Sequence, residues 1–225
     1  MEKNKEFEYY EKLMANAMSL QDTFNYSCKE CGNCCRNRKE PVLLTGVDVF
    51  RIAKALQIEP AEVLKKHTKS YIGDYSKLPC VILRERDDGS CSLLRKGLCT
   101  VHRLKPIVCA LHPVGRMYHL LEKRFIYFMQ KVSCGSREQT HTLKEWLDFF
   151  GIRETEETQE IYSNILKVFS EKIYALKNKD KIEFFQKLFL QVLYIDYKID
   201  EDYKPQLLKN IKLLQETVPG INFDM

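Results

Sequence analysis

The stretch Cys28-Lys-Glu-Cys31-Gly-Asn-Cys34-Cys35 places four cysteines within eight residues. The chain has nine cysteines in 225 residues, and all of them precede residue 135. A buried cysteine behaves as a small apolar residue and has no reason to cluster. A soft metal ion, in contrast, collects thiolates from a short loop and from distant segments into one coordination shell. The pattern therefore predicts a metal-binding chain.

Length and composition support this prediction. A chain of 225 residues can bury a core without disulfides. Residues 1–11 are charged and aromatic and lack the apolar stretch of a secretory signal. The longest apolar segment, residues 188–195, is too short to span a bilayer. We therefore expect a cytoplasmic protein without membrane contact, and in that reducing compartment clustered cysteines more often bind metal than pair with each other.

The net charge is +5, from 36 Lys and Arg against 31 Asp and Glu. A tetrathiolate site with a doubly charged metal centre carries about two net negative charges, so cations near the cysteines would compensate it. We therefore expect no nucleic-acid partner, and the sequence leaves a protein partner open without naming one. The cations beside the cysteines are Lys29, Arg36, Arg38, Lys39, Arg84, Arg86, Arg95, Lys96, Arg103 and Lys105.

The periodicity of apolar residues predicts three stretches. Residues 2–20 show helical spacing, and residues 23–140 are irregular and hold every cysteine. Within that part Thr45 and Asp48 form a capping box, and residues 116–132 favour a hairpin. From Thr142, which forms a second capping box with Glu145, the pattern is helical to the end.

These stretches predict a mainly α fold with a small irregular or β part. We expect a cysteine-rich metal-binding domain at residues 1–140, with an N-terminal helix. A helical extension at residues 141–225 should form a bundle. Trp146 and Phe149 should pack this extension onto the cysteine-rich domain.

The spacing of the cysteines suggests the type of centre. The run Cys28-x-x-Cys31-x-x-Cys34 has the ligand spacing of an iron–sulfur loop, and Gly32 suits a tight turn that needs positive φ. Adjacent Cys34 and Cys35 should point in different directions, which indicates two neighbouring sites or one ligand beside a structural cysteine. The later cysteines are far apart in sequence, so we expect metal binding and folding to be coupled.

The order of these residues resembles the CxxCxxCC family, also called YkgJ-like, of zinc- or iron-chelating domains. The segment from Cys28, with the helix start at Thr45, resembles the beginning of the family pattern, residues 89–113 its second block and Cys134-Gly135 a later element. The likeness spans about residues 25–136. It implies eight metal ligands: Cys28, Cys31, Cys34, Cys35, Cys91, Cys99, Cys109 and Cys134.

Three other residues depart from the pattern. Cys80 has no counterpart, so we expect it to be a bystander. His102 and His112 follow cysteines at Cys-x-x-His spacing, which a zinc site could use. Because they occupy positions where the family commonly has aromatic residues, we interpret them as packed or hydrogen-bonded side chains.

The ligand set suits either of two metals. Zinc sites usually draw two close cysteine pairs, whereas this chain offers a run of three and remote single thiolates. Three close thiolates and one remote thiolate suit a 4Fe–4S cluster. We therefore favour one or two iron–sulfur clusters, with zinc as the alternative.

Three functions fit this interpretation. The first is a redox, scaffold or metal-handling role for a cysteine-cluster metal-binding protein. The second is a methyltransferase-like iron–sulfur enzyme, because the family is distantly similar to flagellin lysine N-methylases. It would need an S-adenosylmethionine pocket, for which the sequence has no motif, and the sequence identifies no catalytic residue. The third is a structural zinc domain that mediates protein contact.

Overall fold

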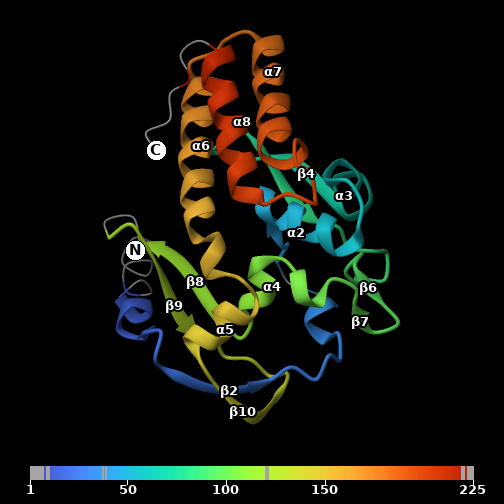
Figure 1. Ribbon diagram of the computed structural model, residues 1–225, viewed down its shortest axis with the longest axis vertical. Helices are drawn as coiled ribbons and strands as arrows, with labels where there is room; N and C mark the ends of the chain where they lie inside the picture. The colour runs from blue at the N-terminus through green and yellow to red at the C-terminus, as the bar shows by residue number, and fades with distance from the viewer. Residues whose placement is uncertain are drawn as a thin grey trace. The chain divides into compact units, whose positions relative to one another are not determined.

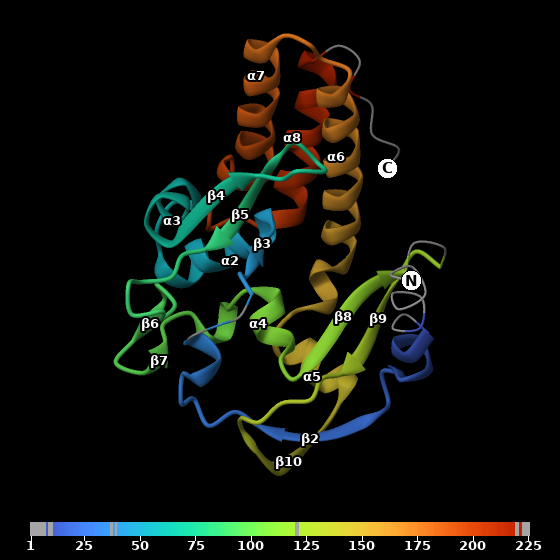
Figure 2. The same cartoon turned by 180° about the vertical axis from the view of Figure 1, so that it is seen from behind.

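The computed structural model describes residues 8, 11–36, 38, 40–119, 122–218 and 221 (Figures 1 and 2). Packing divides the chain into two compact units. Unit 1 consists of residues 1–31 and 107–156, and unit 2 of residues 32–106 and 157–225. The division falls between Cys31 and Gly32, so the four-cysteine run contributes two cysteines to each unit. The expected division into a metal-binding domain at residues 1–140 and a helical extension at residues 141–225 stays a prediction.

A small antiparallel sheet forms one part of unit 1. Strand β8 (Val114–His119) pairs with β9 (Arg124–Met129), and β1 (Ala17–Met18) adds to the other side of β9. The pairing of β8 with β9 confirms the hairpin that the aromatic and β-branched residues of this region predict. Ile126 and Tyr127 of β9 are buried in the core of the unit.

A two-stranded ribbon and two helices complete unit 1. Strand β2 (Thr23–Ser27) pairs with β10 (Ser136–Thr142) and so joins residues more than a hundred positions apart (Figure 1). Helix α5 (Leu143–Phe149) follows β10 directly, because the Thr142 hydroxyl and the Glu145 carboxylate form the predicted capping box. The short helix α4 (Ile107–Leu111) and the 3-10 turn η3 (Arg153–Thr155) are further helical segments of this unit.

Trp146 of α5 anchors the helix to the elements that carry cysteines. Its indole Nε1–H lies 3.1 Å from the carbonyl oxygens of both Ala110 and Leu111 in α4. Its ring also packs edge-on against Tyr26 of β2. Phe149, which we expected to share this role, has a 54% exposed side chain.

A three-stranded sheet with two helices forms the first part of unit 2. The strand order is β3 (Leu43–Leu44), β5 (Pro79–Leu83) and β4 (Thr68–Ile72). Helix α2 (Gly46–Leu56) begins at the predicted Thr45–Asp48 capping box, and α3 (Pro60–His67) begins with a proline in its first turn and runs into β4.

The C-terminal helices form the second part of unit 2. Helices α6 (Glu156–Tyr174), α7 (Lys179–Leu190) and α8 (Tyr203–Thr217) run side by side in both ribbon views. The π-helical turn η4 (Gln191–Ile195) follows α7 and contacts α2. Buried side chains of these segments form an apolar core: Ile165, Phe169, Phe185, Phe189, Leu193, Tyr194, Leu207 and Ile211.

The expectation of a mainly α fold is wrong. The described residues form ten strands in four small sheets as well as the helices, so the fold is mixed α/β. The strands are only two to seven residues long, and three of the six pairings join strands far apart in the sequence. Such strands leave little period-two alternation in the sequence, whereas a helix of three turns leaves a clear pattern.

The expected N-terminal helix can be compared only in part. Residues 1–7, 9 and 10 lie outside the described residues. Residues 11–15 are helical, but β1 begins at Ala17, so the helix does not extend to Leu20. In the part of the chain that the structure describes, none of the helices combines the length and the apolar character needed to cross a membrane.

Candidate metal centre

The four-cysteine run bends into a short turn at Gly32. The 3-10 turn η1 (Asn33–Cys35) starts after this glycine, whose φ is 71°. A Cβ atom there would lie only 2.7 Å from the carbonyl oxygen of Gly97. Both the left-handed backbone and the close approach require glycine, which confirms the positive φ predicted for this residue. The turn presents Cys34 and Cys35 at its end.

Two other segments of unit 2 bring cysteines to this turn. The Cys91 amide donates to the Cys35 carbonyl at 2.8 Å, so the two backbones are in direct contact. Strands β6 (Leu94–Arg95) and β7 (Leu98–Cys99) form a tight hairpin that places Cys99 opposite Leu94. Residues 96 and 97 both have positive φ, as a two-residue hairpin turn requires. The hairpin thus returns Cys99 to the neighbourhood of Cys91.

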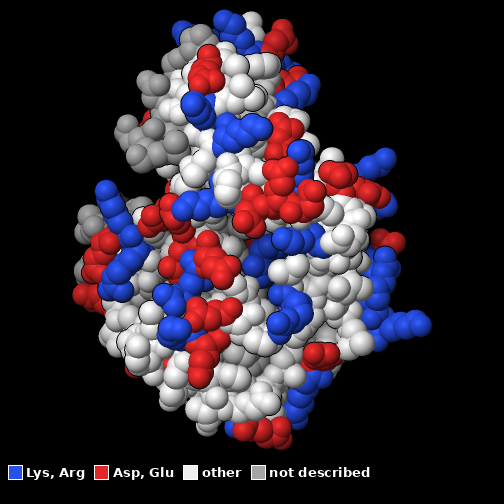
Figure 3. Space-filling model, in the orientation of Figure 1, with Lys and Arg blue, Asp and Glu red and all other residues white. Residues whose placement is uncertain are grey.

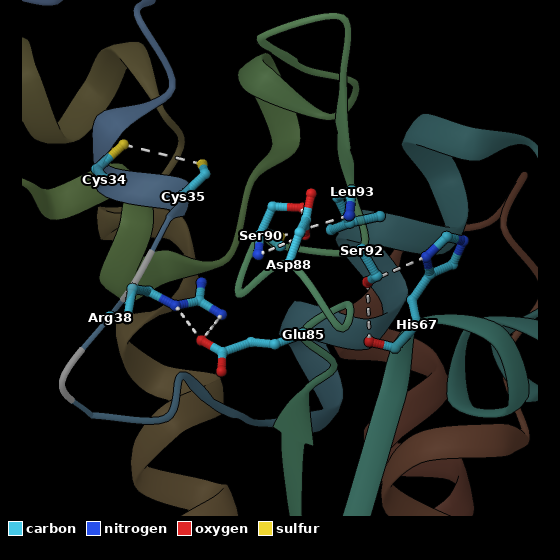
Figure 4. A network of polar contacts seen from close by, with 10 residues as sticks. Cys34, Cys35, Arg38, His67, Glu85, Asp88, Ser90, Ser92 and Leu93 are labelled. Atoms are coloured by element: carbon cyan, nitrogen blue, oxygen red, sulfur yellow. Dashed lines mark hydrogen bonds and ion pairs between the residues drawn. The ribbon is translucent and has the colours of Figure 1, made fainter.

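The thiols of these residues interact with one another. The sulfur atoms of Cys34 and Cys35 lie 3.9 Å apart (Figure 4). The Cys35 thiol also shares a hydrogen bond with Cys91, so it lies between two other sulfur atoms. Cys99 is close enough for the charges of Cys91 and Cys34 to raise the pKa of its thiol, although burial is the main cause of that increase. Three of the five cysteines of unit 2, Cys34, Cys35 and Cys91, are thus linked through their thiols, and Cys99 completes a group of four near them.

The protonation of the group is uneven. The hydrogen bond with Cys35 lowers the pKa of Cys34 to about 6, and a second hydrogen bond with Cys35 lowers the pKa of Cys91 to about 6. The same two hydrogen bonds raise the pKa of Cys35. Cys35 therefore keeps its proton, which it can donate to one of these two neighbours at a time. The lowered pKa of Cys34 and of Cys91 favours the thiolate, the form that binds metal.

Two cations accompany the thiolates. The charges of Lys105 and Arg38 help to lower the pKa of Cys34, and Arg38 also donates a hydrogen bond to Cys91. Arg38 is held in place by Glu85, whose Oε1 lies 3.2 Å from its Nη2 (Figure 4). Arg38 and Lys105 are among the cations that the sequence suggested as compensating charges. The contact of Arg38 with Glu85 had no signal in the sequence.

The four other predicted ligands belong to unit 1. Strand β2 ends at Ser27, which pairs with Ser136 at the start of β10. Cys28 and Cys134 therefore leave the same end of this ribbon. Gly135 lies between Cys134 and the start of β10, with a φ of 78°, and a Cβ there would lie 2.4 Å from the Tyr26 ring. The glycine permits this close approach.

Cys134 also contacts side chains from two other segments. Its sulfur lies 3.1 Å from Nε2 of His112 and 3.7 Å from the Tyr26 hydroxyl. Cys109 lies on α4, three residues before His112. The histidine that the sequence suggested to be packed or hydrogen-bonded is thus a direct partner of a predicted ligand. Cys31 and Cys28 are exposed.

Cys80, the expected bystander, lies elsewhere in unit 2. It is in β5, opposite Tyr71 of β4, and its thiol is 3.9 Å from the Leu78 carbonyl oxygen. None of the nine cysteines, all of which the structure describes, is disulfide-bonded.

The donor set fits a thiophilic metal, although the shells are not closed. Among the described residues, no three His, Cys, Asp or Glu side chains are already positioned to hold one ion. The grouped thiols, the lowered pKa of two of them and the nearby cations are the properties that such a site needs. Cysteine side chains can complete a shell by rotation about χ1, without a change in the fold.

Comparison with known proteins identifies the cysteine-rich region. A family model named CxxCxxCC, described as "Putative zinc- or iron-chelating domain", matches residues 27–142. Neither the curated proteins nor the solved structures gave a match to the chain. The family match includes the eight predicted ligands and covers more than half of the chain. The chain therefore belongs to the CxxCxxCC family of zinc- or iron-chelating domains.

Proposed function

We propose that the chain is a metal-binding protein whose unit 2 centre consists of Cys34, Cys35, Cys91 and Cys99. The observation that carries this proposal is the chain of thiol contacts from Cys34 through Cys35 to Cys91. Three separate segments converge there, and holding thiolates close together is unfavourable unless a cation compensates them. A metal ion is the compensating charge that such a group is suited to bind.

A single zinc or iron ion is our first candidate for this centre. Sulfur atoms bound to one zinc ion at about 2.3 Å in tetrahedral geometry lie about 3.8 Å apart. The Cys34 and Cys35 sulfurs are 3.9 Å apart. The two adjacent cysteines therefore suit neighbouring corners of one coordination tetrahedron. This distance favours a shared site over both sequence-based alternatives, two neighbouring sites or one ligand beside a structural cysteine.

An iron–sulfur cluster is the second candidate, favoured by the run Cys28-x-x-Cys31-x-x-Cys34. The run has the spacing of a cubane loop. A cluster held by this run would use Cys34 together with Cys28 and Cys31. The thiol contacts group Cys34 with Cys35 and Cys91 instead, and for this reason the cluster is only the second candidate.

We extend the proposal to a second centre in unit 1. Cys28 and Cys134 lie at one end of the β2–β10 ribbon, and Cys109 is linked to them through His112, which contacts Cys134. With Cys31 they make a second set of four thiols. In this set His112 could act as a hydrogen-bond donor to the Cys134 thiolate, which would hold that ligand in orientation.

The proposed role follows from the coordination count. Four thiolates fill a tetrahedral shell and leave no position for a substrate, so we propose a structural or electron-transfer role for the unit 2 centre. The alternative of a methyltransferase-like enzyme would need an open metal position. It would therefore require that one of the four thiolates is not a ligand.

Metal and sulfide analysis tests the content of the centre. Protein purified without oxygen should contain zinc or iron with no acid-labile sulfide. Zinc protein should be colourless, whereas a single ferric ion should give colour without sulfide. Stoichiometric sulfide together with broad absorbance near about 400 nm would instead support an iron–sulfur cluster. Protein that binds neither metal at stoichiometric amounts would contradict the proposed function.

A further inference from the structure

A cavity of about 520 Å³ lies in unit 2 beside the segment that carries Cys91 and Cys99. Four cationic side chains line it: Lys66, Arg84, Arg86 and Arg95. No acidic side chain is among the described residues that line it. A pocket with this lining attracts anions, because the focused positive potential has no carboxylate within the wall to cancel it.

Two of the arginines are held rigidly by the backbone. Arg84 donates from Nε and Nη2 to the Thr68 carbonyl at 3.0 and 2.8 Å. Arg86 donates from Nη2 to the carbonyls of Ser92 and Leu94. Carbonyl groups fix the position of a guanidinium without neutralising its charge, and each guanidinium has five N–H donors. The pocket therefore has preorganised positive charge.

The other two cations are at the rim. Lys66 forms an ion pair with Glu62 on the outer face of α3, and both side chains are exposed to solvent. Such exposed pairs are weak, so Lys66 can exchange this partner for a bound anion at little cost. Arg95 is an exposed residue of β6. Neither side chain is part of the core.

His67 and Ser92 form the polar part of the wall. The imidazole Nδ1 of His67 lies 3.3 Å from the Ser92 hydroxyl (Figure 4). Burial lowers the pKa of His67, and the charges of Arg95, Lys66, Arg84 and Arg86 lower it further. All four cations therefore act on one point in the pocket. With the Ser92 hydroxyl donating to Nδ1, the neutral imidazole keeps its Nε2–H as a donor for an anion held there.

We propose that this cavity binds a small phosphate-bearing molecule. The guanidinium N–H groups that do not donate to protein acceptors suit the oxygen atoms of a phosphate dianion, which accept charge-assisted hydrogen bonds. Leu56 and Ile58 form an apolar part of the wall, which suits an adjoining apolar group of the ligand. The volume is that of a small-molecule site. On the face shown in Figure 3, cationic and anionic side chains are interspersed.

Calorimetric titration of the full-length, metal-loaded protein tests this proposal with inorganic phosphate and phenyl phosphate as probes. Both should bind at one site, and phenyl phosphate should bind more tightly because its ring can contact Leu56 and Ile58. Arg95→Gln should weaken each by about tenfold, the effect of losing one charge-assisted hydrogen bond. Lys66→Gln is a second test at an exposed position. Lys212→Gln, an exposed charge on α8, is the matched control.

The possible outcomes distinguish binding in this pocket from nonspecific attraction of anions to the positively charged protein. Weaker binding in Arg95→Gln and Lys66→Gln, with wild-type binding in Lys212→Gln and unchanged metal content in all three, would support the site. Absence of binding by both probes at millimolar concentration would overturn it. Equal weakening in the control would overturn it too, as would tight binding of a single-stranded oligonucleotide without competition by phenyl phosphate.

Discussion

At the scale of single residues, Cys35 explains the chemistry of the unit 2 group. Its thiol lies within hydrogen-bonding reach of both Cys34 and Cys91, so its single proton can offset the repulsion on one side or the other. The sequence predicted all four cysteines of this group as ligands through the family resemblance. It could not predict which of the eight belong together, because grouping depends on a backbone contact between residues 35 and 91.

The pKa of Cys34 leads to a prediction for the metal-free protein. A thiolate, not a thiol, reacts with iodoacetamide. Because the pKa of Cys34 is lowered to about 6 and the residue is exposed, it should react at nearly its full rate at pH 7. The rate should fall as the pH drops through about 6.

Cys99 is the internal comparison in that experiment. Burial raises the pKa of its thiol, so its reaction should become fast only above the ordinary value of 9.0. Mass spectrometry of peptides from pulse-labelled protein measures both rates. A Cys34 rate that climbs steadily from pH 7 to pH 9 would show that the residue is an ordinary thiol.

At the scale of elements, the centre depends on two tight turns that meet. Gly32 and Gly97 both have positive φ, and the carbonyl oxygen of Gly97 lies against the position where Gly32 would carry a Cβ. Alanine at Gly97 would add only the strain of a left-handed backbone, whereas alanine at Gly32 would add both that strain and a steric clash. Gly97 has no atom within 4 Å of its own Cβ position.

We predict that Gly97→Ala costs about 1 kcal/mol of unfolding free energy, from the left-handed backbone alone. Gly32→Ala should cost at least about 1 kcal/mol more, because a methyl group would force the turn away from residue 97. It should also reduce metal retention. Denaturant unfolding and metal analysis of the two variants measure these effects. Equal losses in both would mean that the contact between the turns is unimportant.

Local signals predicted some elements and not others. The capping boxes at Thr45 and Thr142 start helices as predicted, since each box is encoded within four residues. The β8–β9 hairpin also follows from a local pattern. The β2–β10 ribbon does not, because its partners are more than a hundred residues apart and β10 is mostly polar and exposed. Misjudging such strands led to the wrong fold class.

At the scale of the whole molecule, metal and fold should be coupled. The proposed unit 2 ligands span residues 34–99, and the segments between them include the sheet of that unit. A bound ion would cross-link these segments in the folded state only, so its binding free energy adds to stability.

Removal of the metal should therefore lower the melting temperature of the full chain by roughly 10 °C, which corresponds to a few kcal/mol for a protein of this size. Differential scanning calorimetry before and after a thiol-compatible chelator gives the shift. Re-addition of zinc or ferrous iron should restore the original value. A melting temperature that does not change on chelation, in protein shown to have lost its metal, would separate binding from folding.

The most direct test of the central claim is the metal content of Cys35→Ser, measured by native mass spectrometry of protein purified without oxygen. Cys80→Ser is the matched control, because Cys80 lies on β5 outside the group. The account predicts that Cys35→Ser loses the unit 2 metal, while Cys80→Ser keeps the full wild-type content. Wild-type metal content in Cys35→Ser, or loss of metal in Cys80→Ser, would contradict the assignment of this centre.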